Sequence, residues 1–228
     1  MNNTALNVIA IGIFFTTMTS LLTPVLNISP AIPAGFAATV LGLLTVDTFS
    51  WQGKGATIFL DWVASFSPAH RQRIIRHEAG HFLTAYFLGI PITGYTLSPW
   101  EAWRQGQPGL GGVAFDTESL FDKTPATGDV RLILDRFCTV WMAGIAAEEM
   151  FYPESEGGGD DRQKIREALA TFGYPAKTGK QKQRWAQLQA NTMLSKYRQA
   201  YDALVEAMTN RASVEECTQA IQENCPRD

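Results

Sequence analysis

The chain has 228 residues, of which 46% are hydrophobic and 18% charged, so one good-sized domain plus an appendage is expected. Its formal net charge of -3, with no long basic stripe, argues against nucleic acid as a partner. Its three cysteines are scattered without a Cys-x-x-Cys spacing, which argues against a disulfide framework or a thiolate metal site and fits a reducing compartment.

The N-terminal fifth of the chain is apolar and almost without charge. No charged residue occurs from Ala5 to Leu26, and a second uncharged stretch runs from Ala31 to Val46. The first stretch is long enough to cross the hydrocarbon core of a bilayer, and the second is borderline. Asn27 to Pro30 forms the predicted break between them. We therefore expect residues 1–50 to form a membrane-anchoring, transmembrane helical hairpin.

Positive charge begins only after this hairpin, at Lys54 and then from Arg71 onwards. By the positive-inside rule, the following domain lies on the cytoplasmic or stromal side of an inner, plasma or thylakoid membrane. Two alternatives remain. A cleaved secretory signal normally starts with basic residues, which Met1-Asn2-Asn3 lacks. A buried hairpin of a soluble fold also remains, because four threonines and Pro24 dilute the first stretch.

Residues 51–66 are expected to link the hairpin to the rest of the chain. Gln52 to Thr57 contains two glycines and reads as a linker. Ile58 to Phe66 is amphipathic and is expected to lie at a membrane surface.

A helix is predicted from Arg71 to Leu88, with a start signal at Ser67-Pro68 and a stop signal at Gly89-Ile90-Pro91. It carries the motif His77-Glu78-Ala79-Gly80-His81. Positions i and i+4 share one helix face, so the two imidazoles can bind a single metal ion. The glutamate can then act as general base toward a water on that metal. The alternative is a metal-free histidine pair, which needs other partners to offset its burial.

The remaining pattern is mostly helical. Strands are expected at Ile92–Pro99 and Gly111–Phe115, with a loop at Trp100–Leu110 between them. Helices are expected at Thr127–Phe151, Arg162–Phe172 and Lys182–Asn210, and a short final one starts at Ser213. Small residues from Met142 to Ala147 predict close packing of the first of these helices against another. The fold class is therefore mainly α with a small β element.

A catalytic zinc ion has three protein ligands and one open position. His77 and His81 supply two, so we expect the third to be a carboxylate from another helix. The candidates are Glu148, Glu149, Asp160 and Asp161. For the two aspartates, which sit at a predicted helix start, capping of that helix is the structural alternative.

Three motifs, in this order, resemble the peptidase domain of the FtsH-type, membrane-anchored, ATP-dependent zinc metalloproteases. Arg76–His81 is similar to the catalytic helix of that family. Ala143–Glu149 is similar to its Gly-Gly-Arg-x-Ala-Glu-Glu stretch, and Gly157–Asp161 to its Gly-Ala-Ser-Asn-Asp turn. The resemblance extends through the closing helices and covers roughly Pro68 to Ile221.

This resemblance implies a helical, zincin-like peptidase domain over residues 67–228 that hydrolyses a protein or peptide substrate. It implies that Zn²⁺ is held by His77, His81 and Asp161, with Glu78 as the catalytic base. Either Glu148 or Glu149 then accepts a hydrogen bond from a ligand histidine, at the ring nitrogen that does not bind the metal.

The chain departs from the family in three respects. The family normally carries an ATPase module before its peptidase domain, and we find none here. Gly173–Gln181 is no phosphate loop, because its glycines are too far apart by one residue and no Ser or Thr closes it. We therefore expect this chain to bind no ATP, and two possibilities remain: it cleaves flexible segments or small membrane proteins by itself, or it depends on a separate AAA ATPase or FtsH-type partner. Ala143 and Ile145 replace a glycine and an arginine of the family.

The second functional hypothesis is a proteolytically inactive, FtsH-like scaffold or assembly factor in the membrane. The intact motif favours the enzyme, because a scaffold has no chemical need for Glu78.

Overall fold

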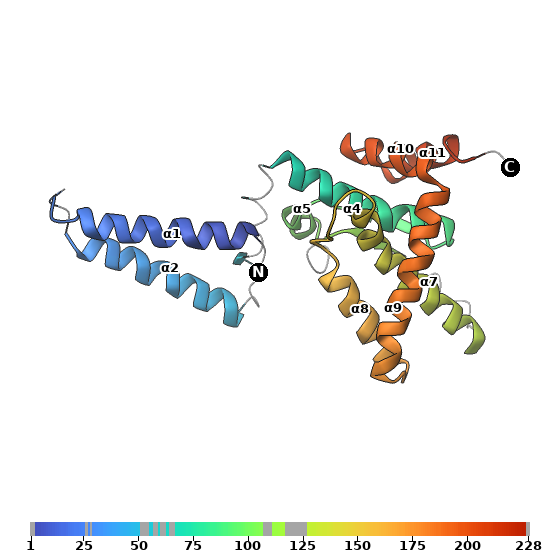
Figure 1. Ribbon diagram of the computed structural model, residues 1–228, viewed down its shortest axis with the longest axis horizontal. Helices are drawn as coiled ribbons and strands as arrows, with labels where there is room; N and C mark the ends of the chain where they lie inside the picture. The colour runs from blue at the N-terminus through green and yellow to red at the C-terminus, as the bar shows by residue number, and fades with distance from the viewer. Residues whose placement is uncertain are drawn as a thin grey trace. The chain divides into compact units, whose positions relative to one another are not determined.

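The computed structural model describes residues 3–25, 27, 29–50, 55–56, 59, 63, 67–106, 111–116 and 127–226. The chain divides into two compact units, Met1–Ser67 and Pro68–Asp228. The described residues are mostly helical, with one two-stranded sheet (Figure 1), and the prediction of a mainly α fold is confirmed. Most of the predicted linker and amphipathic segment, residues 51–66, lies outside the described residues.

Two helices, α1 (Asn3–Leu22) and α2 (Ala31–Ser50), pack against each other in the first unit. α2 is long and apolar enough to cross a membrane, whereas the apolar part of α1 is the shorter stretch Ile9–Leu22. α2 continues past Val46 and includes the charged residue Asp47. The Asp47 carboxylate accepts hydrogen bonds from the backbone N–H groups of Gly55 and Ala56, at 2.8 and 2.9 Å.

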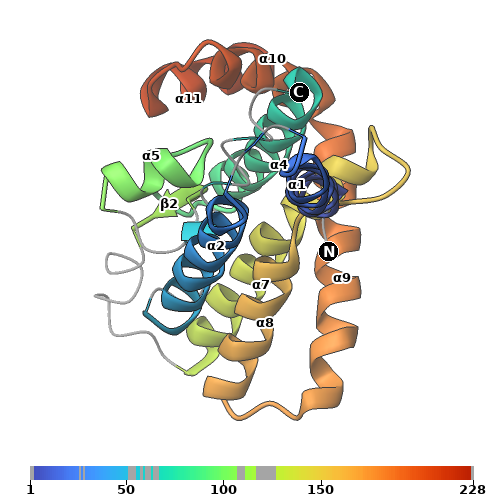
Figure 2. The same cartoon turned by 90° about the vertical axis from the view of Figure 1, so that its left-hand side faces the viewer.

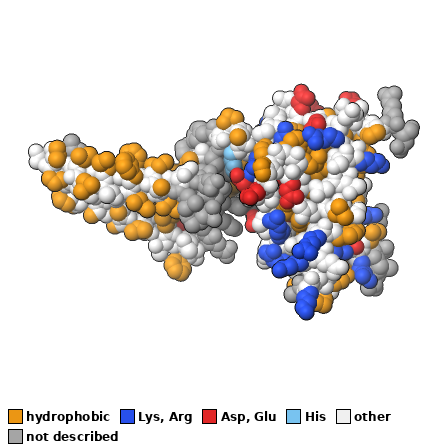
Figure 3. All heavy atoms as spheres, in the orientation of Figure 1, with side chains coloured by type: hydrophobic (Ala, Val, Ile, Leu, Met, Phe, Trp, Pro, Cys, Tyr) orange, Lys and Arg blue, Asp and Glu red, His pale blue; other side chains and the backbone are white. Residues whose placement is uncertain are grey.

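Three of the four threonines in the first apolar stretch form local hydrogen bonds to the backbone. Thr16, Thr19 and Thr23 each donate to the carbonyl oxygen four residues earlier, at 2.7 to 2.8 Å. Such bonds remove the need for water or a protein partner, so these residues are compatible with an apolar surrounding. Large apolar side chains are exposed along both helices, including Ile13 at 63% and Leu43 at 66%, and Figure 3 shows hydrophobic side chains spread over the visible face of these helices.

The second unit is built around α4 (Pro68–Phe87), which carries the His-Glu-Ala-Gly-His motif and packs on α7 (Thr127–Glu149). α7 also packs against α8 (Gly159–Thr171) and α9 (Ala176–Lys196), which lie beside it in Figure 2. Small residues bring α4 and α7 together. A Cβ atom at Gly80 would lie only 2.5 Å from the Ala143 carbonyl oxygen, so the predicted close helix contact is confirmed.

The sheet pairs β1 (Ile92–Tyr95) antiparallel with β2 (Val113–Phe115), which confirms the predicted strand pair, although both strands are shorter than predicted. The loop predicted between them is wrong in part, because it contains a short helix, α5 (Pro99–Arg104). Ser98 caps this helix by accepting a hydrogen bond from Glu101 N, and proline occupies its first turn.

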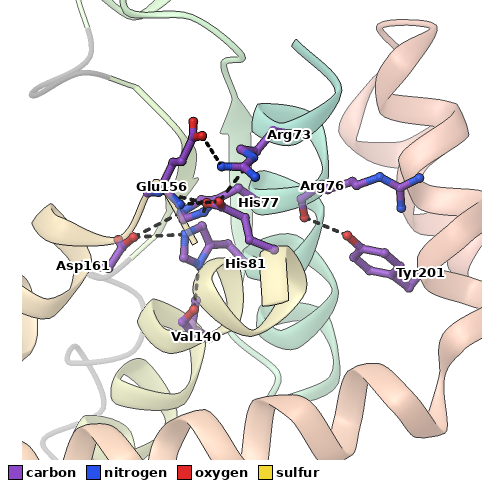
Figure 4. Close-up of polar contacts among 10 residues, drawn as sticks. Arg73, Arg76, His77, His81, Val140, Glu156, Asp161 and Tyr201 are labelled. Atoms are coloured by element: carbon purple, nitrogen blue, oxygen red, sulfur yellow. Dashed lines mark hydrogen bonds and ion pairs between the residues drawn. The ribbon is translucent and has the colours of Figure 1, made fainter. Parts of the chain in front are cut away.

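The long helix predicted at residues 182–210 is also wrong in part. α9 already begins at Ala176, and the backbone of Tyr197 separates it from α10 (Arg198–Thr209). α10 packs on α4, where the buried Tyr201 donates a 2.9 Å hydrogen bond to the Arg76 carbonyl oxygen (Figure 4). The final helix, α11 (Val214–Glu223), starts after Ser213 with a capping box, as expected.

Candidate metal centre

One turn of α4 brings three metal-binding side chains together. The donor atoms of His77, Glu78 and His81 all lie within 4.8 Å of one another. Both histidines are buried, with residue exposures of 9% and 6%. This buried group can hold a metal ion, as the i, i+4 spacing predicts.

A carboxylate far away in the sequence faces the same point. Asp161 Oδ2, from the first turn of α8, lies 3.2 Å from His77 Nε2 and 3.5 Å from His81 Nε2 (Figure 4). In a tetrahedral site with metal–ligand bonds of 2.0 to 2.1 Å, the ligand atoms are about 3.3 Å apart. Asp161 Oδ2 therefore lies at about this spacing from each of the two histidine nitrogens.

The structure also separates the two candidate aspartates. Asp161 is buried, with 6% exposure, whereas Asp160 is exposed. Gly158 occupies the cap position of α8, and no side-chain capping bond is formed there. Helix capping therefore does not explain the buried carboxylate, which instead points at the two imidazoles and accepts a 3.1 Å bond from Lys164.

The outer nitrogen of each imidazole has its own acceptor. His77 Nδ1 lies 2.7 Å from Glu148 Oε1, and His81 Nδ1 lies 2.7 Å from the Val140 carbonyl oxygen. A carbonyl oxygen can only accept, so His81 Nδ1 carries a hydrogen, and a neutral ring then has its lone pair on Nε2. Carboxylate–histidine–metal arrangements fix ligand histidines in this way.

The three atoms that face one another, His77 Nε2, His81 Nε2 and Asp161 Oδ2, therefore need a cation between them. With both rings neutral, two Nε2 lone pairs face the Asp161 carboxylate with no hydrogen between them. In the metal-free site, a proton takes this position. Burial alone would lower the pKa of His77, but the hydrogen bonds to Asp161 and Glu148 outweigh it and raise that pKa to about 10. Burial would raise the pKa of Asp161, but His81 and His77 hold it far below its usual range. The donor set thus fits a bound divalent cation.

Glu148 and Glu149 have different surroundings. Glu148 is buried, and besides His77 it accepts backbone hydrogen bonds from Glu156 N at 2.9 Å and Gly157 N at 3.2 Å. Burial would raise the pKa of Glu148, but the hydrogen bonds from His77 and from the Glu156 amide, together with the charges of His77 and Arg73, lower it overall. Glu149 is exposed and accepts a bond from Gln187, away from the histidines. Of the two glutamates, Glu148 supports His77.

Sequence reasoning did not identify two further contacts of the site. Arg73, one turn before His77, lies 3.8 Å from Glu148 Oε2 and 2.8 Å from Glu156 Oε1 (Figure 4). Its i, i+4 spacing to His77 was the available signal. Glu78 Oε2 accepts a 3.1 Å hydrogen bond from Val113 N at the start of β2. A backbone donor of this kind leaves no trace in the sequence.

Glycines give the site its close contacts. A Cβ atom at Gly144 of α7 would overlap the His77 imidazole, so only glycine fits beside that ring. Gly112, with φ of +116°, lets β2 approach Glu78, and a Cβ atom there would lie 3.0 Å from Glu78 Oε2.

No protein-family model and no curated protein sequence matches the chain.

Proposed function

We propose that this chain is a membrane-anchored zinc metalloendopeptidase of the FtsH type. The observation that carries the proposal is the convergence of His77 Nε2, His81 Nε2 and Asp161 Oδ2, with the Glu78 carboxylate beside them. The three motifs that resemble the FtsH peptidase domain contribute these residues in the same order.

The donor chemistry favours zinc among the divalent metals. Two imidazoles and one carboxylate, all buried, form a donor set that catalytic zinc sites use, with one position left for water. Calcium and magnesium prefer oxygen ligands alone. Among the described residues, the group of possible metal ligands contains no cysteine.

A bound zinc ion would acidify water and polarise the scissile carbonyl. In this proposal, the protein's own groups do the rest. Glu78 takes the proton of the attacking water and delivers it to the leaving amine. Glu148 and the Val140 carbonyl hold the two imidazoles in the tautomer that presents Nε2 inward. Asp161 supplies the third ligand and the negative charge that balances the cation.

The first unit supports anchoring in a membrane. Only 11% of the apolar window of α2 is buried, which is unlike the core helix of a soluble protein. The serine and threonine hydroxyls satisfied within α1 and α2 suit a lipid surrounding. We therefore propose that α1 and α2 form a hairpin in an inner, plasma or thylakoid membrane. The peptidase domain then lies on the cytoplasmic or stromal side, where a separate AAA ATPase or FtsH-type partner would deliver folded substrates.

The test is hydrolysis of casein or a quenched-fluorescence peptide by the full chain. Activity should require zinc and be lost with 1,10-phenanthroline. Glu78→Gln should retain about one zinc ion per chain and lose hydrolysis, because it removes the base and none of the three proposed ligands. Full activity of the Glu78→Gln variant would contradict the proposed role of Glu78.

One contact favours a second candidate function, a zinc-binding but inactive scaffold or assembly factor. Glu78 is already engaged by Val113 N, so a catalytic role requires that this 3.1 Å bond be exchanged for one to water. Stoichiometric zinc together with no hydrolysis of any peptide would favour the scaffold over the enzyme.

A further inference from the structure

Charge is distributed unevenly in the second unit, and α9 holds the largest imbalance. This helix contains five of the chain's 19 Lys and Arg residues and none of its 22 Asp and Glu residues. Four of the five lie in its first half, at Lys177, Lys180, Lys182 and Arg184. Figure 3 shows basic side chains gathered over the region of α8 and α9.

The exposed basic residues share one face of α9 with two large apolar side chains. At 3.6 residues per turn, Lys177, Lys180, Arg184, Trp185 and Leu188 fall within an arc of about 140°. Trp185 is 44% exposed and Leu188 62% exposed. The opposite face is buried, with Ala186, Ala190 and Leu194 in the core. We call the five exposed residues the α9 face.

The charges of this face are largely uncompensated. Lys182, at its edge, pairs with Asp135 of α7 and also lies 5.1 Å from the Trp185 ring centre. Among the residues that the structure describes, no carboxylate forms an ion pair with Lys177, Lys180 or Arg184. Exposing a tryptophan and a leucine to water among these cations is unfavourable unless another apolar surface covers them.

We propose that the α9 face docks on the surface of an anionic membrane. Helices that lie in a bilayer interface combine Lys and Arg with Trp and Leu, because the cations meet headgroups while the apolar groups enter the acyl boundary. The same chain carries α2, which is apolar enough to cross a membrane, so anionic headgroups would be present at high local concentration. This inference rests on the proposed membrane anchoring and does not depend on the peptidase activity.

Docking would hold the second unit against the bilayer and fix its orientation there. Each basic side chain near an anionic surface strengthens binding by a factor of roughly five, so three of them amount to about 100-fold. Because these charges are exposed, salt should weaken the contact.

The test measures Trp185 directly. The full chain is incorporated into vesicles whose lipids carry brominated acyl chains, which quench tryptophan on contact. The difference between wild type and Trp185→Phe isolates the signal of this residue. We expect it to be strongly quenched in vesicles rich in phosphatidylglycerol and to recover in phosphatidylcholine alone or at high salt. Trp103, on α5 and 63% exposed, is the matched control, and its signal should not follow lipid charge.

A charge variant completes the experiment. Changing Lys177, Lys180 and Arg184 together to glutamine should abolish the lipid-charge dependence of Trp185 quenching, while circular dichroism and zinc content stay unchanged. Quenching that is equal in anionic and neutral vesicles, or that survives the triple substitution, would overturn the proposal. So would Trp185 left unquenched in both lipids, the result expected if an acidic protein occupies the face.

Discussion

Asp161 Oδ2 lies 3.2 Å from His77 Nε2, although 84 residues separate the two in the chain. The contact forms because α7 packs on α4 through small residues and the glycine-rich turn after α7 brings the start of α8 back over the histidines. Both partners are buried, and no polar group other than a cation or proton satisfies two imidazole nitrogens and a carboxylate at this spacing.

Asp161→Asn should weaken zinc binding by more than the roughly 10–100-fold that loss of an outer-shell partner costs, since an amide is a poor ligand. Competition with a chelator of known affinity measures this change. Asp160→Asn is the matched control, because its carboxylate is exposed one residue away, and zinc affinity should stay at the wild-type value. Equal losses in the two variants would contradict the assignment of Asp161 as ligand.

The two adjacent glutamates of α7 provide a second matched pair. Glu148→Gln should lower zinc affinity about 10–100-fold, because His77 loses the carboxylate that fixes its tautomer. Glu149→Gln should leave zinc affinity unchanged, since the Glu149 carboxylate is exposed and accepts its hydrogen bond from Gln187, not from a histidine. Isothermal titration with zinc on the metal-free variants distinguishes the two. A loss of zinc affinity in Glu149→Gln but not in Glu148→Gln would contradict the assignment of Glu148 as the partner of His77.

Gly144→Ala should displace the His77 ring, because the new methyl group would occupy its position. We expect loss of stoichiometric zinc and destabilisation of about 1–3 kcal/mol, as for overpacking in a core. Gly159→Ala is the control, since a Cβ atom there meets nothing within 4 Å. Zinc content and thermal unfolding check both. A Gly144→Ala protein with wild-type zinc affinity would show that α7 can move away from α4.

The pH dependence of zinc binding follows from the raised pKa of His77. That pKa is about 10 in the folded metal-free protein and 6.5 when unfolded, so the charged ring stabilises the metal-free fold below pH 6.5, and this contribution is lost as the pH rises toward 10. Zinc must displace the proton. Its apparent affinity should therefore rise about tenfold per pH unit over this range.

Chelator competition at several pH values measures this slope, and thermal unfolding of the metal-free protein should show the opposite trend. A zinc affinity that does not change with pH would mean that His77 is already neutral in the metal-free protein.

The sequence predicts this site unevenly, for physical reasons. His77, Glu78 and His81 are local, and the i, i+4 spacing places them without knowledge of the fold. The choice between Glu148 and Glu149, or between Asp160 and Asp161, depends on helix rotation at a tertiary contact. Neighbouring residues differ there by about 100°, which local pattern does not fix.

The fold shows the same limit. The signals for α4 and α11 are strong, because both have start residues and clear periodicity. α5 was missed although Ser98, Pro99 and Glu101 form a recognisable helix start, since two exposed tryptophans and nearby glycines suggested a loop. The break at Tyr197 was missed because no Gly or Pro marks it. It arises where α10 turns onto α4, which is a tertiary effect.

X-ray absorption at the zinc edge of the purified full chain, together with metal analysis, tests the metal centre most directly. We predict about one zinc ion per chain, coordinated by nitrogen and oxygen only, with the scattering pattern of two imidazoles, and with a changed first shell in Asp161→Asn. A protein that binds no zinc, or whose zinc has sulfur ligands, would contradict the account.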